Sequence, residues 1–248
     1  MCGRFTLTSS PAEIAVFFGA ERQGLDHAPD YNVAPTTDIV TVVGAGAGGG
    51  GGGGRTLELM HWGLVPSWAK DISIGSRMIN ARSETLAEKP SFRRAFVRRR
   101  CIVVADGFYE WQAVPGQKRR QPMYIARTDG DPLAFAGLWE IWHPVGDPER
   151  TGMELHSCTI VTCAANGKIA PVHHRMPVVL EKSDWSAWLD VEGTSAADAT
   201  ELLRASGDEV LTFHPVSTDV NRVGTNNAHL IDPVEPDSGD HDGQMRLL

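Results

Sequence analysis

A cysteine directly behind the initiator methionine is the first chemically unusual feature of this 248-residue chain. The chain opens with MCGRF, so removal of Met1 would leave Cys2 at the amino terminus. Its α-amine and its thiol would then lie on adjacent carbons, forming a 1,2-aminothiol. Side-chain identity at a chain end ordinarily matters little. Cys2 is therefore either a reactive terminal group or an incidental thiol in a first strand.

Three further polar stretches hold side chains that transfer protons or form hydrogen bonds. They are MINARSE with Asn80, Arg82 and Glu84, DGFYEW with Phe108 and Glu110 on one strand face, and VHHRMP with His173, His174 and Arg175. Each has an ordinary structural alternative. Asn80 is suited to a helix N-cap, Glu110 to a paired strand carboxylate, and His173 to a hydrogen-bonded loop position.

Charge is distributed unevenly along the chain, whose formal net charge is −8. Residues 181–240 hold 13 Asp/Glu against 3 Lys/Arg, whereas residues 71–127 hold 12 Lys/Arg against 5 Asp/Glu. Phosphate binding depends on a local basic surface and not on the total charge. The basic segment is therefore either a phosphate-binding face or a solvated one.

The cysteine pattern excludes the usual structural roles of this residue. Cys2, Cys101, Cys158 and Cys163 show neither CxxC spacing nor a zinc pattern. The sequence shows no secretory signal, and no apolar run approaches the roughly 20 residues that span a bilayer. We expect a reduced cytoplasmic protein without metal, cofactor or membrane partner.

Helices and strands are predicted from capping signals and apolar patterns. Ser10 to Glu13 form a capping box with Pro11 at the first helical position. Further helices are expected after Ser91, after Ser183, and from Ser195 to Ser206 with Gly207 as the C-cap. After the first strand, further strands are expected over 31–43, 56–68, 101–111, 122–126, 133–142, 155–163, 176–181 and 210–216.

Many strands and few scattered helices predict an α+β fold with a mainly antiparallel, barrel-like sheet and peripheral helices. The glycine-rich run at 44–54 lacks a phosphate-loop lysine and opens no helix, so it is interpreted as a flexible hairpin insertion. No linker divides the chain, which predicts one domain over 1–236 and a disordered tail over 237–248.

The motifs MCGRF, YNVAP, WGLVPSW, INARSE, DGFYEW, HHRMP and FHPVS, in this order over roughly residues 1–234, resemble the SRAP family of abasic-site processing proteins. The glycine insertion and the acidic C-terminal tail depart from the family pattern but touch none of the motifs. The resemblance implies the SRAP fold and a covalent function in the DNA damage response. The mature N-terminal Cys2 would crosslink to abasic sites in single-stranded DNA and shield the lesion.

The chemistry of a terminal cysteine agrees with this implication. An open abasic site carries an aldehyde, and an α-amine with a pKa of about 8 is substantially neutral at cytosolic pH. The amine attacks the aldehyde, and the neighbouring thiol captures the resulting imine as a five-membered thiazolidine. Lysine lacks the thiol and an internal cysteine lacks the amine, so only a terminal cysteine performs both steps.

The resemblance also implies roles for the other residues. Glu110 would shuttle protons, His173 would protonate the sugar ring oxygen, and Asn80 would hydrogen-bond the lesion. His174 is the weaker candidate beside His173. The predicted DNA-contact residues are Arg4, Phe5, Asn32, Pro35, Trp68, Arg82 and Arg175, with the arginines on phosphates and Phe5, Pro35 and Trp68 against bases. Single-strand/double-strand junctions are a second possible substrate, and association with the nucleoid is expected when DNA is bound.

Three alternative functions stay open at this point. An N-terminal-nucleophile hydrolase of the glutamine amidotransferase kind also begins with Cys-Gly, but its later arginine and Asn-Gly motifs are missing. A self-processing peptidase would use Cys2, Glu110 and His173 to remove Met1, although a general methionine aminopeptidase also accepts a small second residue. A non-covalent single-strand binder would not need Cys2.

Overall fold

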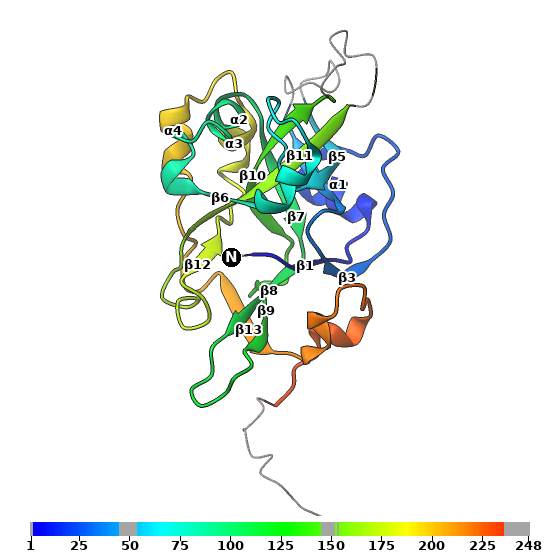
Figure 1. Ribbon diagram of the computed structural model, residues 1–248, viewed down its shortest axis with the longest axis vertical. Helices are drawn as coiled ribbons and strands as arrows, with labels where there is room; N and C mark the ends of the chain where they lie inside the picture. The colour runs from blue at the N-terminus through cyan, green and yellow to red at the C-terminus, as the bar shows by residue number, and fades with distance from the viewer. Residues whose placement is uncertain (1, 45–53, 145–151, 153, 236–248) are drawn as a thin grey trace, which may run out of the picture.

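In the computed structural model, which describes residues 2–44, 54–144, 152 and 154–235, five strands close into a ring. They are β4 (Asp38–Val43), β5 (Arg55–Trp62), β7 (Arg100–Ala105), β10 (Leu133–Trp142) and β11 (Leu155–Ala164). Neighbours are antiparallel in the order β11–β10–β7–β4–β5. A parallel pairing of β11 with β5, with Cys158 opposite Trp62, closes the ring. The result is a small barrel, as Figure 1 shows above β1.

Apolar residues on both faces explain why these strands close instead of forming an open sheet. All residues of β7 are buried, as are Trp62 of β5 and Trp139 of β10. Three short strands extend the barrel edges: β2 (Ala20–Glu21) beside β5, and β6 (Asn80–Arg82) and β12 (Arg175–Pro177) beside β11. β6 and β12 flank the end of β11 on its two sides, since Thr162 pairs with both Arg82 and Pro177, so two of the polar stretches lie beside this one strand.

A second, fully antiparallel sheet lies below the barrel in Figure 1. Its order is β13 (Leu211–Pro215), β9 (Gln121–Arg127), β8 (Gly107–Gln112), β1 (Phe5–Leu7) and β3 (Asp30–Val33). The first strand thus lies inside this sheet, between β3 and β8.

The strand expected over 101–111 is divided at Asp106, where the chain passes from the barrel to the second sheet. The Asp106 carboxylate accepts hydrogen bonds from the backbone and hydroxyl groups of Thr8 and Ser9. A Cβ on Gly107 would lie 2.3 Å from the Tyr124 hydroxyl oxygen, so the strand after the bend admits no side chain here. The bend therefore ties β8 to the end of β1.

The serine caps predicted for α1 (Pro11–Phe18) and α4 (Ala196–Glu201) are present, whereas α2 (Arg93–Arg98) and α3 (Trp185–Leu189) begin one residue later than predicted, after Phe92 and Asp184, without a side-chain cap. α1 has the complete Ser10/Glu13 capping box and ends at left-handed Gly19. α3 buries its tryptophans against the barrel. Four 3-10 helices complete the described elements: η1 (Ile72–Arg77), η2 (Ser83–Thr85), η3 (Thr218–Asn221) and η4 (Ala228–Ile231).

Several element boundaries differ from the sequence prediction. The strand expected over 31–43 is divided into β3 and β4, which lie in different sheets, and the strand expected over 56–68 ends at Trp62. α4 (Ala196–Glu201) begins after Ser195 but ends before Ser206, because Asn166 binds the carbonyls of Ser206 and Gly207 and holds that stretch out of the helix. The strand expected over 176–181 ends at Pro177, because the hydrogen bonds of Val178 go to both β11 and β10. Because α4 ends at Glu201, Gly207 is not its C-cap.

The predicted α+β fold, with one domain, a mainly antiparallel barrel-like sheet and few helices, is confirmed. Of the glycine-rich run, only Gly44 and Gly54 belong to the described residues. The domain end expected at 236 and the tail over 237–248 lie outside them. In the described part of the chain, every helix is too short or too polar to cross a bilayer.

Candidate active site

The pairing of β1 with β8 positions the amino terminus. Phe5 lies opposite Phe108, and Tyr109 N donates to Arg4 O at 2.9 Å. Continuing this register toward the start of the chain brings Gly3 opposite Glu110. Cys2 is fully buried beside that carboxyl. Two residues more than 100 positions apart in the sequence are thus neighbours.

The surroundings of Cys2 keep its thiol protonated. Burial, and then the nearby Glu110 carboxylate, raise the pKa of the Cys2 thiol far above its ordinary value. Glu110 is itself only 3% exposed. Glu110 is therefore placed where it can act as an acid or base beside a thiol that stays protonated.

Asn80 reaches the same place from the barrel edge. Parallel pairing sets Asn80 of β6 beside Ile160 of β11, and its Nδ2 donates to Cys2 O at 2.7 Å. Its Oδ1 is buried and has no hydrogen-bond partner among the described residues. Asn80 therefore begins a strand instead of capping a helix, and it keeps one acceptor at the amino terminus.

His173 lies in the loop that leads from β11 into β12. Gln112 of β8 donates to Pro171 O at 3.1 Å, which ties this loop to the strand that carries Glu110. The His173 and His174 rings lie 4.4 Å apart, with His174 exposed. Positive charge lowers the pKa of His174, from His173 first and also from Arg175 and Arg82. The loop is thus part of a basic neighbourhood.

Three of the predicted DNA-contact residues form hydrogen bonds within the protein. Arg4 is 9% exposed and donates to Asn32 Oδ1 at 2.6 Å and Val220 O at 2.9 Å. Asn32 in turn donates to Arg222 O and Thr225 O at 3.1 and 2.8 Å. These bonds join the first strand to the segment after β13. Arg4 and Asn32 are therefore internal ties in this structure, and their contacts with DNA stay a prediction.

Arg175 is the third of these residues. Its guanidinium forms a two-pronged pair with Glu84, at 2.9 and 3.0 Å, and donates to Thr162 O at 2.6 Å. The hydrogen bonds from Arg175 lower the pKa of the Glu84 carboxyl. This pair fastens the turn after β6 to β12, so Arg175 joins the strands that carry Asn80 and His173.

Phe5 is buried as well, because its ring packs 5.1 Å from that of Trp62 in the core. The stacking of Phe5 on a base stays a prediction, and in this structure the ring serves the core. Trp68 is 58% exposed, Arg82 is exposed and Pro35 is half-buried. Arg82 lies on the same face of β6 as Asn80, since side chains alternate along a strand. These three residues lie where a nucleic acid has access.

The basic segment 71–127 divides into exposed and internal cations. Arg100 is fully buried on four backbone carbonyls, Arg99 pairs with Glu140 at 2.8 Å, and Arg127 pairs with Asp129. The other cations of the segment are exposed: Arg77, Arg82, Lys89, Arg93, Arg94, Arg98, Lys118, Arg119 and Arg120. Nine of the 12 are thus at the surface.

Sequence reasoning did not assign Gln112, Glu84 or Thr162 to the site. Gln112 follows Glu110 by two positions, and strand alternation is a signal that points to it. Glu84 stands in the INARSE motif, but only the fold shows that it meets Arg175. Arg175 donates to the backbone carbonyl of Thr162 as well as to its hydroxyl. Every residue has a backbone carbonyl, so the residue type at position 162 does little to predict this contact.

The described residues include no group of three or more His, Cys, Asp or Glu side chains suited to a metal ion. The cysteines at 2, 101, 158 and 163 are unpaired and buried. The site brings together a thiol, a carboxyl and an amide, and Gln112 ties the loop of His173 to the strand that carries Glu110.

Comparisons with known proteins agree with this geometry. The chain is 40% identical over 236 residues to the "Abasic site processing protein YoqW" of Bacillus subtilis, covering 94% of this chain and 99% of that protein. It is 33% identical over 202 residues to the "Abasic site processing protein HMCES" of Gallus gallus, covering 73% and 58% of the two chains.

Solved structures share the fold. A Bacteroides thetaiotaomicron protein matches with a TM-score of 0.80 at 23% identity, covering 94% of this chain and all of that one. A phage-related protein from Bordetella bronchiseptica matches at 0.66 and 30% identity, covering 93% and 100%. The sequence model described as "SOS response associated peptidase (SRAP)" matches residues 1–223. This chain therefore belongs to the SRAP family.

Proposed function

We propose that this protein processes abasic sites, and that it does so by forming a covalent bond between Cys2 and the open aldehyde of the lesion in single-stranded DNA. The observation that carries the proposal is the meeting of Cys2, Glu110 and Asn80 at the junction of the barrel and the second sheet. Relatives named abasic site processing proteins cover nearly the whole chain. The covalent step requires that Met1 be removed.

The reaction uses both groups of the terminal cysteine. The neutral α-amine attacks the aldehyde carbon, and loss of water leaves an imine. The thiol sulfur then adds to the imine carbon while its proton passes to the nitrogen, which closes the thiazolidine. A protonated thiol suits this order, because it leaves the first attack to the amine and keeps a proton available for the ring closure.

Each neighbouring side chain has one task in this scheme. Glu110 takes a proton from the attacking amine and returns it to the departing hydroxyl. His173 protonates the sugar ring oxygen, which favours the open aldehyde. Asn80 holds the Cys2 carbonyl through Nδ2 and offers Oδ1 to a hydroxyl of the lesion. The residues that move protons are thus separate from the nucleophile.

The DNA contacts in this proposal are narrower than the sequence suggested. Arg82 contacts a phosphate next to the lesion, and Trp68 and Pro35 contact bases, since these three are the predicted contact residues with exposed or half-exposed side chains. The exposed cations of segment 71–127 extend the phosphate track. Arg4, Asn32 and Arg175 act by holding the site together.

The decisive experiment mixes the mature protein, with the absence of Met1 verified by intact mass, with an abasic single-stranded oligonucleotide. We expect a shifted band that survives heat and SDS, and no such band with an undamaged oligonucleotide. Glutaminase activity, or release of Met1 by the purified protein alone, would instead favour an N-terminal-nucleophile hydrolase or a self-processing peptidase. A mature protein that gives no stable band contradicts the proposal.

A further inference from the structure

One ring nitrogen of His173 faces both a donor and an acceptor of the same residue. His173 Nδ1 lies 3.1 Å from the backbone N and 3.0 Å from the backbone O of Arg175. A backbone N–H only donates and a carbonyl only accepts, whereas Nδ1 donates when protonated and accepts when not. Nδ1 therefore has a hydrogen-bond partner in either state.

The peptide groups that flank Nδ1 are held by the surrounding fold. The backbone of Arg175 is in register with Ala164 of β11, and its guanidinium is bound to Glu84 and Thr162. The ring is held from the other side, because His173 N donates to Ile169 O at 3.0 Å and the ring packs on His174. These contacts of Arg175 therefore hold in place the N–H and the carbonyl that flank His173 Nδ1.

Two other histidines show what an ordinary contact looks like. His214 Nε2 lies 2.8 Å from Ile231 O, and His27 Nδ1 lies 3.1 Å from Ala28 O. A carbonyl accepts only, so each contact requires a proton on that nitrogen. Neutral His214 is therefore the Nε2–H tautomer, and neutral His27 is the Nδ1–H tautomer.

We propose that Arg175 is a positioning residue whose peptide groups stabilise both neutral tautomers of His173, so that Nε2 presents a lone pair in one tautomer and an N–H in the other while the ring stays still. In the Nε2–H tautomer, with Nδ1 accepting from Arg175 N, Nε2 donates a hydrogen bond to the lesion. The inference rests on the proposed function for its use in catalysis. With Nδ1–H bound to Arg175 O, Nε2 takes a proton from the substrate and the ring becomes an imidazolium. Nε2 then gives that proton to the sugar oxygen and the ring is neutral again, so no proton is gained or lost overall.

The test is an NMR measurement on the free mature protein with ¹⁵N-labelled histidine rings. At a pH of about 8.5 an imidazole of ordinary pKa is neutral. His27 and His214 then mark the two tautomeric limits, and the His173→Ala variant assigns the His173 signals. We expect both ring-nitrogen shifts of His173 to lie between these limits. Shifts equal to those of either limit, meaning one tautomer alone, overturn the proposal.

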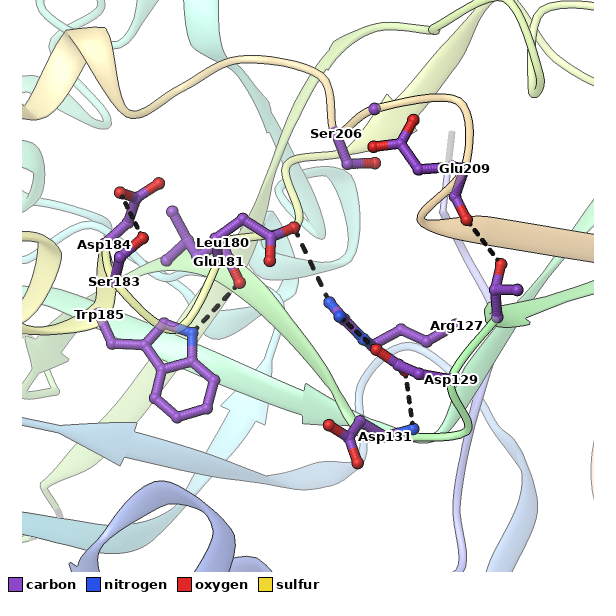
Figure 2. Close-up of polar contacts among 12 residues, drawn as sticks. Arg127, Asp129, Asp131, Leu180, Glu181, Ser183, Asp184, Trp185, Ser206 and Glu209 are labelled. Atoms are coloured by element: carbon purple, nitrogen blue, oxygen red, sulfur yellow. Dashed lines mark hydrogen bonds and ion pairs between the residues drawn. The ribbon is translucent and has the colours of Figure 1, made fainter.

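The role of the Glu84–Arg175 pair in positioning His173 is tested with a matched pair of variants. Glu84→Ala removes the anchor of Arg175 without touching Cys2, Glu110 or His173. Figure 2 shows a similar two-pronged pair, in which Arg127 binds Asp129 at 2.9 and 2.7 Å near Glu181 and Glu209, and these residues make none of the site contacts. Asp129→Asn is therefore the control, and Glu84→Gln replaces Glu84→Ala if the latter does not fold.

We expect Glu84→Ala to shift the His173 nitrogen signals and to slow crosslink formation about tenfold, since small displacements of catalytic groups cost rate. Asp129→Asn should change neither. Unchanged signals and rate in both Glu84 variants overturn the positioning role. If wild-type protein does not crosslink, the proposed function fails and the catalytic use of both tautomers fails with it. If His173 has a single tautomer and the protein still crosslinks normally, the inference about Arg175 is overturned and the proposed function is not.

Discussion

At the scale of single residues, the burial of Cys2 decides the order of its chemistry. The Cys2 thiol has a raised pKa, first from burial and then from Glu110, so it is a weak nucleophile before the lesion binds. The α-amine of a mature chain has an ordinary pKa of about 8 and is substantially neutral near that pH. In the proposed reaction the amine therefore attacks first, and the thiol makes the product stable.

Cys2→Ala tests this order. The mature variant keeps an α-amine, so it should still form an imine that borohydride traps, but it should leave no heat-stable adduct without borohydride. Gel electrophoresis of reactions with an abasic oligonucleotide, with and without reduction, measures both. A stable adduct from unreduced Cys2→Ala would exclude the thiazolidine.

Glu110→Gln tests the proton shuttle. The amide has nearly the same shape but does not accept a proton, and a positioned acid–base group contributes roughly 10²–10⁴-fold to rate. We expect slower crosslinking by about that factor, with single-strand affinity before the covalent step unchanged. Rapid-quench crosslinking rates and fluorescence anisotropy measure the two quantities. A rate within about threefold of wild type would return Glu110 to a purely structural role.

At the scale of elements, the first strand is held on both edges and by its ends. β1 pairs with β3 and β8, Asp106 binds Thr8 and Ser9, and Arg4 is tied through Asn32 to the segment after β13. An amino terminus usually frays. Here the ties keep Cys2 in one place, which is what a terminal nucleophile requires.

Asn32→Ala should therefore destabilise the fold instead of acting through DNA. It removes the acceptor of a buried guanidinium and leaves several carbonyls without their donor. We expect a loss of about 2–4 kcal/mol in the free energy of unfolding, measured by urea denaturation. Exposed Arg82→Ala is the control and should stay within about 0.5 kcal/mol of wild type. An Asn32→Ala protein of normal stability but weak DNA binding would restore the direct contact.

At the scale of the whole molecule, charge is divided between segments of opposite sign. Segment 71–127 exposes nine cations, whereas residues 181–240 carry a large acidic excess. The acidic segment repels a second phosphate backbone, and extruding a lesion from a duplex costs a few kcal/mol. Both effects favour a single strand.

Abasic single-stranded DNA should therefore crosslink faster than the same lesion inside a duplex. Affinity before the covalent step should fall with salt, with a slope of about −0.7 per phosphate neutralised. Arg82→Glu should flatten that slope and slow capture, and Asp129→Asn should not. Crosslinking rates over a salt series on matched substrates provide the measurement. Equal, salt-independent rates on both substrates would show that the basic segment is only a solvated face.

The sequence by itself indicated the candidate reactive groups and determined many of the local elements. Cys2, Asn80, Glu110 and His173 stand in recognisable motifs, and the Ser10 capping box begins α1 as predicted. Strand positions followed from apolar runs. These features are readable because capping, alternation and the chemistry of a terminal cysteine depend on residues close together in the chain.

Only the tertiary structure decided which polar residues face outward. Arg4, Asn32 and Arg175 were predicted to contact DNA, the arginines through phosphates, yet in this structure each side chain is bound to groups at least 13 positions away. The pairing of β5 with β11 and the bend at Asp106 likewise depend on residues that are far apart in the chain. A guanidinium has no local signal for its partner, because its choice between a carboxylate, a carbonyl and a phosphate depends on which groups the fold brings within reach.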